Sequence, residues 1–307
     1  MLIAAVGFGT LSLSARRLGA LDVTALPYVL WRSLLGGVVV MVVFAGLMAT
    51  GRARWPASDG VPRNERLALL AAGLLGAVIN LAMFTALERS TVALTLITFY
   101  TYPALTTLGA TRTYGEPIDR QKGASLILAS AGLALVVLAP LLSDGGIKVD
   151  ALAVGLALTA AVGQAIFLLV AGRGFSSVPS VLSTAIVMLI GGAVFAALVL
   201  GTGQLPGAVI PFSDAATWPW IFMTSIVGAA VPTVALLVGT RRIGPGRTSI
   251  LMMAEPVVGV VIAGLFLAEQ PAPLQLVGGA AVIAAGILLQ FPVRAPALPI
   301  EAPAQPV

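Results

Sequence analysis

The stretch SILMMAEPVVGVVIAGLFLAEQP, residues 249–271, is almost entirely apolar. A membrane-spanning helix needs about 20 mostly apolar residues, and this stretch is long enough. Glu255 and Pro256 nevertheless stand side by side well inside it. A charge near the centre of the hydrocarbon layer costs about 2.5–3.5 kcal/mol on insertion scales, so the carboxylate should face a water-filled cavity or a partner. The stretch therefore predicts a membrane helix with a polar group near its midpoint.

The composition of the whole chain indicates that most of it lies in lipid. The 307 residues are 59% hydrophobic and only 9% charged, with a mean hydropathy of +1.04. A soluble domain carries about 25% charged residues. The net charge of +5 is therefore weak evidence for nucleic acid, which we do not expect as a partner. Excess Arg and Lys in a membrane protein more often marks cytoplasmic loops.

The residue inventory argues against an enzyme. The chain has no Cys and no His, which excludes disulfides, thiolate nucleophiles and Ser/His/Asp triads, and removes the commonest metal ligand. No P-loop is present, and the acidic residues are scattered singly instead of clustered as a metal cage. We therefore expect no catalytic residue, no cofactor and no metal. The apolar start has no charged leader or A-x-A-like site, so no signal peptide is expected.

Ten apolar runs of about membrane-span length follow one another along the chain and predict an all-α membrane protein with ten transmembrane helices. They lie at 2–18, 25–49, 67–87, 91–111, 121–142, 151–171, 178–200, 217–240, 245–268 and 272–291. The first run is short because Arg16 and Arg17 end it. Either these arginines snorkel to the interface, or residues precede Met1.

The distribution of Arg and Lys predicts the orientation. With the N-terminus inside, twelve of the seventeen lie in cytoplasmic segments, four lie on the opposite side, and Arg32 lies within a span. This bias indicates a multi-pass protein of the inner (plasma) membrane with both termini cytoplasmic.

Two halves of the chain share a pattern. Pro103 is followed thirteen residues later by Glu116, and Pro256 is followed thirteen residues later by Glu269, each in the fourth helix of a five-helix half. Because five is odd, the second half enters the membrane inverted relative to the first. We predict a first repeat at 1–142, a connecting loop at 143–150, a second repeat at 151–292 and a disordered tail at 293–307.

Glu255 and Arg32 are the two ionisable groups deepest within spans. Glu255 either binds substrate or a proton, or it is a structural carboxyl that hydrogen-bonds its neighbours near Pro256. Its counterpart in the first half is Tyr102. Arg32 either snorkels outward or reaches an anionic substrate group or Glu255. Both alternatives stay open for each residue.

The remaining polar groups at intermediate depth either bind substrate or hydrogen-bond between helices. They are Asn80, Thr98, Tyr100, Tyr102 and Gln164. Three prolines lie within helical runs, where a missing N–H predicts a kink. They are Pro103, Pro232 and Pro256. The fifth and tenth runs carry small residues at four-residue spacing, which predicts packing faces. These pairs are Ser125/Ala129 and Ala280/Ala284.

The chain resembles the EamA-type members of the drug/metabolite transporter superfamily. The resemblance rests on the repeat and on the segments FYTYPALTTLGATRTYGEP (99–117), MMAEPVVGVVIAGLFLAEQP (252–271) and LPYVLWRSLLGG (26–37), and it runs from residue 7 to residue 290. It implies a transporter of small organic metabolites, frequently an exporter of amino acids or similar solutes. The first four helices of each half would then surround a central cavity.

We therefore expect a secondary transporter, an exporter of a small metabolite such as an amino acid, that works by alternating access in a lipid bilayer. Proton coupling is one of the alternatives, and no oligomeric state is predicted. The competing hypothesis is a non-transporting membrane binding or scaffold protein with the same fold. A wet polar cavity between the halves would separate the two, because only a transporter needs one.

Overall fold

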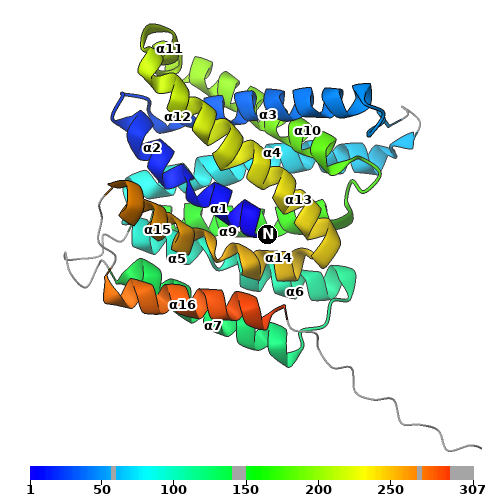
Figure 1. The fold of residues 1–307 in the computed structure, drawn as a ribbon, viewed down its shortest axis with the longest axis vertical. Helices are drawn as coiled ribbons and strands as arrows, with labels where there is room; N and C mark the ends of the chain where they lie inside the picture. Colours follow the sequence, from blue (N-terminus) through cyan, green and yellow to red (C-terminus); the bar gives the residue numbers. More distant parts are fainter. Residues whose placement is uncertain (57–59, 140–149, 268–271, 291–307) are drawn as a thin grey trace, which may run out of the picture.

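The computed structural model describes residues 1–56, 60–139, 150–267 and 272–290, and every regular element in these ranges is a helix (Figure 1). The first half contains α1 (Leu2–Gly9), α2 (Leu11–Gly19), α3 (Ala25–Ala49), α4 (Arg63–Arg89), α5 (Val92–Phe99), α6 (Tyr102–Tyr114) and α7 (Arg120–Leu138). The second half contains α9 (Ala151–Arg173), α10 (Ser180–Gly201), α11 (Leu205–Ser213), η2 (Ala215–Thr217), α12 (Trp218–Phe222), η3 (Met223–Ala230), α13 (Val231–Ile243), α14 (Pro245–Met252), α15 (Glu255–Leu267) and α16 (Pro273–Leu288). The all-α prediction is confirmed. The predicted loop up to residue 149, the tail from 293 and Glu269 lie outside the described residues.

Eight helical segments among the described residues are long and apolar enough to cross a membrane. They are Ala25–Ala49, Arg63–Arg89, Val92–Tyr114, Arg120–Leu138, Ala151–Arg173, Ser180–Gly201, Ala215–Ile243 and Pro245–Phe266. The expected first run is divided at Thr10 into α1 and α2, of 8 and 9 residues, and the tenth is the 16-residue helix α16. A multi-pass membrane protein is thus confirmed, whereas the count of ten spans stays a prediction.

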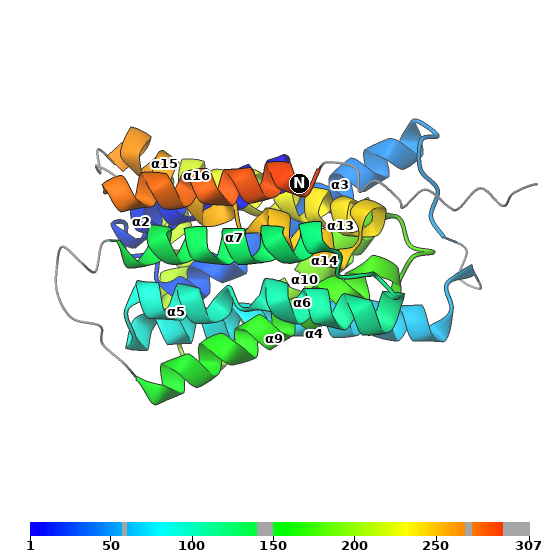
Figure 2. The same cartoon turned by 90° about the horizontal axis from the view of Figure 1, so that it is seen from below.

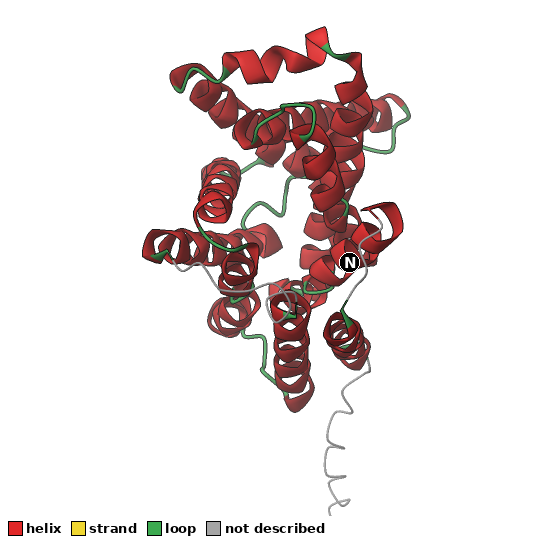
Figure 3. Ribbon diagram, turned by 90° about the vertical axis from the view of Figure 1, so that its left-hand side faces the viewer, coloured by secondary structure: helices red, strands yellow, loops and turns green. Residues whose placement is uncertain are grey.

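The axes of the spanning helices are roughly aligned with one another, as Figure 2 shows from the side. Figure 3 shows several of these helices end-on. Their outward faces carry large apolar side chains with high exposure, such as Ile127 (72%), Val42 (65%) and Leu265 (74%). In water such a surface would be costly, whereas in a bilayer these side chains meet lipid. Many of the buried positions are Ala, whose small side chain lets helices approach closely.

The fourth helix of each half is interrupted at the same place. α5 gives way to α6, and α14 gives way to α15, immediately before a proline that is the second residue of the new helix. Proline has no N–H, so Pro103 leaves the carbonyl of Phe99 without its helical donor, and Pro256 does the same to the carbonyl of Met252. The two prolines are 153 residues apart. Both halves therefore share a discontinuous helix at equivalent positions.

Helix packing repeats in the same way when the two halves are exchanged. α3 packs against its counterpart α10, and α7 packs against its counterpart α16. The pair α4 and α9 corresponds to the pair α13 and α1, and the pair α6 and α9 corresponds to the pair α15 and α1. Each half therefore supplies the same set of contacts to the other, which is what two structural repeats require.

The α7–α16 pair packs through glycine. A Cβ on Gly132 would lie 2.6 Å from the carbonyl oxygen of Gly278, and a Cβ on Gly278 would collide with the carbonyl of Gly132. The predicted face Ser125/Ala129 of α7 is buried. The predicted face Ala280/Ala284 of α16 is wrong, since both residues are exposed. The helix instead turns a neighbouring stripe inward because two glycines there permit closer approach; this stripe is Gly278, Gly279, Val282 and Ala285.

Candidate functional site

A cavity of about 300 Å³ lies between the two halves. All six residues predicted as substrate-binding line it, although they come from different helices: Arg32, Asn80, Tyr100, Tyr102, Gln164 and Glu255. Its lining is supplied by α1 to α6 of the first half and by α9, α10, η3 and α13 to α15 of the second half, and neither α7 nor α16 contributes to it. A cavity between the halves with these polar side chains in its lining is what the transporter hypothesis expects.

Arg32 is held in place by two neighbours. Its guanidinium donates a hydrogen bond from Nη2 to the Oδ1 of Asn80, and Asn80 Nδ2 donates to the carbonyl oxygen of Gly76 at 2.7 Å. The same guanidinium lies 5.9 Å from the centroid of the Tyr28 ring. Arg32 therefore does not simply snorkel outward: it is oriented by α4 and by the preceding turn of its own helix α3.

Glu255 opens α15 and faces the cavity from the second half. Its carboxyl interacts with the hydroxyl of Tyr100 and with the charge of Arg32. Tyr100 in turn packs against Tyr102, with ring centroids 5.8 Å apart, and Phe99 contacts both rings at 5.3 and 5.2 Å. The interruption between α5 and α6 thus presents an aromatic cluster to the carboxylate at the interruption between α14 and α15.

Apolar walls that the sequence did not single out complete the cavity. They are formed by aromatic side chains from α1, α4, α9 and α10: Phe8, Phe84, Phe167 and Phe195. No sequence pattern distinguishes these four cavity-lining Phe residues from Phe residues that face lipid, so the sequence did not predict them. Tyr28 was also missed, although it stands one helical turn before Arg32, where residues four apart share a face. Its hydroxyl accepts a hydrogen bond from Thr224 at 2.8 Å.

A second cavity of about 660 Å³ joins the first at one end of the molecule. The two share Arg32, Tyr100 and Glu255, and the larger one extends to Arg16 and Gln275. These last residues lie near the end of α2 and the beginning of α16. The polar groups of the central cavity are thus approached from the end where α2 meets α3.

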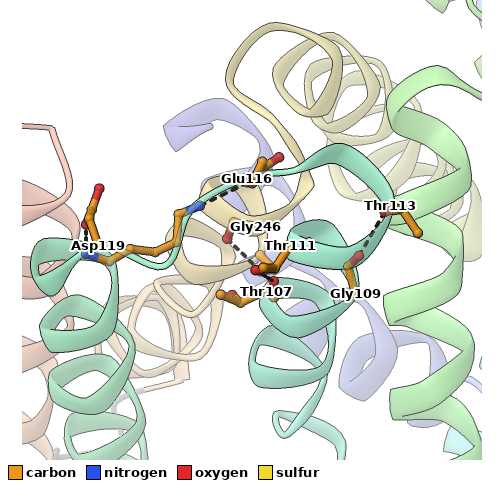
Figure 4. Close-up of polar contacts among 9 residues, drawn as sticks. Thr107, Gly109, Thr111, Thr113, Glu116, Asp119 and Gly246 are labelled. Atoms are coloured by element: carbon orange, nitrogen blue, oxygen red, sulfur yellow. Dashed lines mark hydrogen bonds and ion pairs between the residues drawn. The ribbon is translucent and has the colours of Figure 1, made fainter.

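The opposite end of the molecule is closed by the end of α6 and the beginning of α14 (Figure 4). Tyr114 donates a hydrogen bond to the carbonyl oxygen of Leu169 on α9. Lys122 forms an ion pair with Glu116, with Nζ 3.0 Å from Oε2. A Cβ on Gly246 would lie 2.8 Å from the same carboxylate oxygen, so a larger residue there would displace the Glu116 side chain.

The remaining predicted polar and kink residues occupy less central places. Thr98 donates its hydroxyl to the carbonyl of Leu94 at 2.8 Å, within its own helix, and does not line the cavity. Pro103 and Pro256 follow the interruptions described above. Pro232 is the second residue of α13, directly after the π-helical segment η3, and its neighbour Thr233 lines the cavity.

Comparison with known proteins agrees with this architecture. A solved crystal structure of another protein has the same fold, with a TM-score of 0.72, 19% sequence identity and 94% of each chain covered. No curated protein sequence matches the chain. The model of the EamA-like transporter family matches residues 1–138 and again residues 151–291, which are the two halves of the fold. The chain therefore belongs to the EamA-like transporter family and is a membrane transporter of the drug/metabolite transporter superfamily.

Proposed function

We propose that the protein is a secondary transporter that exports a small zwitterionic metabolite, such as an amino acid, by alternating access. In this proposal ten spans form two inverted five-helix repeats in the inner (plasma) membrane, with both termini cytoplasmic. The six cavity residues named above bind the substrate. The repeats rock about them, so that the site faces one side of the membrane and then the other.

One observation carries the proposal: Glu255 and Arg32 line the same cavity from opposite halves of the chain. A carboxylate and a guanidinium in one space match the ammonium and carboxylate of a zwitterion. Charged side chains in a membrane interior are expensive, which favours a functional reason for keeping both residues. The cavity volume of about 300 Å³ suits a small solute, because ligand cavities start at about this size.

Alternating access is supported by the difference between the two ends. The site connects to the larger cavity at one end, whereas the contacts among Glu116, Lys122 and Gly246 close the other. The fourth helix of each half is interrupted beside the cavity, where a change of angle between its two parts alters access. The positive charge on the closed end supports its assignment as cytoplasmic.

The decisive experiment is transport in reconstituted vesicles with a panel of amino acids and related metabolites, with and without a pH gradient. Glu255→Gln retains the shape of the side chain and removes its charge, so the folded variant should lose transport of zwitterions. If Glu255 also couples a proton, the residual transport should no longer depend on pH between about pH 5 and 8. Glu88→Gln is the matched control, because Glu88 is exposed and does not line the central cavity.

Unchanged transport by Glu255→Gln would make this carboxyl structural and the site assignment wrong. Binding of a metabolite without movement across the vesicle membrane would instead favour the scaffold hypothesis.

A further inference from the structure

A third cavity, separate from the transport site, lies at the closed end of the molecule. Its volume is about 480 Å³, and its walls come from the ends of α6, α9 and α13 and the beginnings of α7 and α14. Three candidate membrane spans end here, at Tyr114, Arg173 and Ile243, and another begins at Pro245. The cavity is therefore at the depth where a bilayer changes from hydrocarbon to headgroups.

Positive charge dominates this cavity. Four arginines from three helices line it: Arg173, Arg241, Arg242 and Arg247. Lys122 and the carboxylates of Glu116 and Asp119 also line it. However, Glu116 pairs with Lys122, and Asp119 accepts a hydrogen bond from the backbone N–H of Lys122 at 2.6 Å, as Figure 4 shows. The carboxylates in the wall are thus engaged with Lys122.

None of the four arginines forms an ion pair with a carboxylate of the described residues, although Glu65 acts electrostatically on Arg241. Arg241 donates to the carbonyl oxygens of Val178 and Phe175 at 2.8 and 3.0 Å, and its buried Nε has no hydrogen-bond partner. Arg173 lies 4.9 Å over the ring of Tyr114. Arg242, which is exposed, and Arg247, which is half-buried, make no hydrogen bond or ion pair with any described residue.

We propose that this cavity binds a phosphate group through Arg242 and Arg247, with Arg173 and Arg241 adding positive charge. Guanidinium groups present paired N–H donors that match phosphate oxygens, and phosphate is the anion that a bilayer supplies at this depth. The two sources of this group are the headgroup of an anionic phospholipid and free inorganic phosphate. The bound group joins α13 and α14 beside Glu116, and so stabilises the closed end.

The test is a titration of the whole chain, held in phosphatidylcholine nanodiscs, with short-chain phosphatidylglycerol, short-chain phosphatidylcholine and inorganic phosphate. The unfolding temperature should rise with a phosphate-bearing anion and not with phosphatidylcholine. A response to phosphatidylglycerol alone identifies the lipid as the source. A response to inorganic phosphate as well identifies the phosphate group itself as sufficient.

Arg242→Gln/Arg247→Gln should require about 30-fold more of the active anion for the same rise. Arg52→Gln/Arg54→Gln is the matched control: it removes the same charge from exposed residues at the same end, outside the cavity, and should respond like the unaltered protein. If the first pair does not fold, the single variants Arg242→Gln and Arg247→Gln should each weaken the response about fivefold.

An equal loss in both double variants would show that diffuse surface charge attracts the anion, and the proposed site would be wrong. The absence of any rise with either anion would also overturn it. The site does not depend on transport, so loss of transport by Glu255→Gln and loss of this response report on separate proposals.

Discussion

Tyr102 and Glu255 occupy equivalent positions in the two repeats, each directly before the proline of an interrupted helix, and both side chains line the same cavity. The repeat therefore brings two chemically different residues to one space. A phenol on one side and a carboxylate on the other make the cavity asymmetric, although the backbone around it is repeated. Such asymmetry suits a solute that has one cationic and one apolar or aromatic part.

Tyr102→Ala is expected to abolish most transport without unfolding the protein, because it removes one wall of the aromatic cluster facing Glu255. Thr101→Ala is the control, since Thr101 is the exposed neighbouring residue and does not line the cavity. Vesicle transport rates and unfolding temperatures should be measured for both. Normal transport by Tyr102→Ala would show that Tyr102 contributes to helix packing and not to transport.

The topology can be tested by thiol labelling, because the chain contains no Cys. Ser176→Cys and Gln204→Cys place single thiols at exposed positions on the two connections that flank α10. A membrane-impermeant maleimide should label them from opposite sides of the membrane, with Ser176 on the cytoplasmic side. Labelling of both from one side would show that α10 does not cross the membrane, and the proposed topology would be wrong.

Gly244→Ala should destabilise the closed end. The backbone of Gly244 has φ +84°, which strains any residue with a Cβ, and the added methyl group would collide with Glu116. Gly203→Ala separates these two effects, because Gly203 has φ +70° but nothing within 4 Å of the added methyl group. Both variants should lose about 1–3 kcal/mol from strain. Only Gly244→Ala should also raise maleimide labelling of a cysteine placed at Ala110, which is buried beside Gly246 at the closed end. An equal response in both variants would contradict this prediction.

Gly278→Ala should destabilise the packing of α7 against α16 by about 1–3 kcal/mol, as overpacking of a close contact does. A methyl group there would collide with the carbonyl oxygen of Gly132. Gly286→Ala, on the same helix, meets only Leu251 at an ordinary 3.6 Å. It should be neutral or stabilising by up to about 1 kcal/mol, because Ala has the higher helix propensity. Denaturant unfolding of both variants checks the difference, and equal unfolding free energies would show that α16 does not pack through Gly278.

Asp150, which precedes α9 outside the spans, should make stability depend on pH. The backbone N–H of Ala153, with further help from that of Leu152 and from Arg89, holds the pKa of Asp150 below its usual value. A carboxylate with a lowered pKa stabilises the folded state above its unfolded pKa, and this contribution is lost as the pH falls through the folded value. Asp150→Asn should therefore be less stable than the unaltered protein near pH 7 and indistinguishable from it in strong acid. Thermal unfolding across that range provides the measurement, and a pH-independent difference would exclude ionisation as its cause.

Much of the fold could be predicted from local patterns along the chain. Apolar length determines where a helix can lie in a bilayer, and this property depends on consecutive residues only. For the same reason Arg32 and Glu255 could be identified as unusual within spans, and the proline spacing could identify the repeat. The depths of the six polar residues expected at the site follow from helical rise. The sequence could therefore predict that they lie near one cavity.

The tertiary structure decided what depends on contacts between distant segments. Only packing orients Arg32 through Asn80, adds Tyr28 and the Phe walls, and selects Gly278 over Ala280 as the packing face of α16. These contacts depend on how the surfaces of the two halves fit together. That fit cannot be inferred from residues that are neighbours in the sequence. The sequence by itself determined that the chain spans a membrane in two repeats with a carboxylate at depth, because hydropathy and spacing are local. Which residues that carboxylate faces, and which end of the cavity is closed, followed from the packing of one repeat against the other.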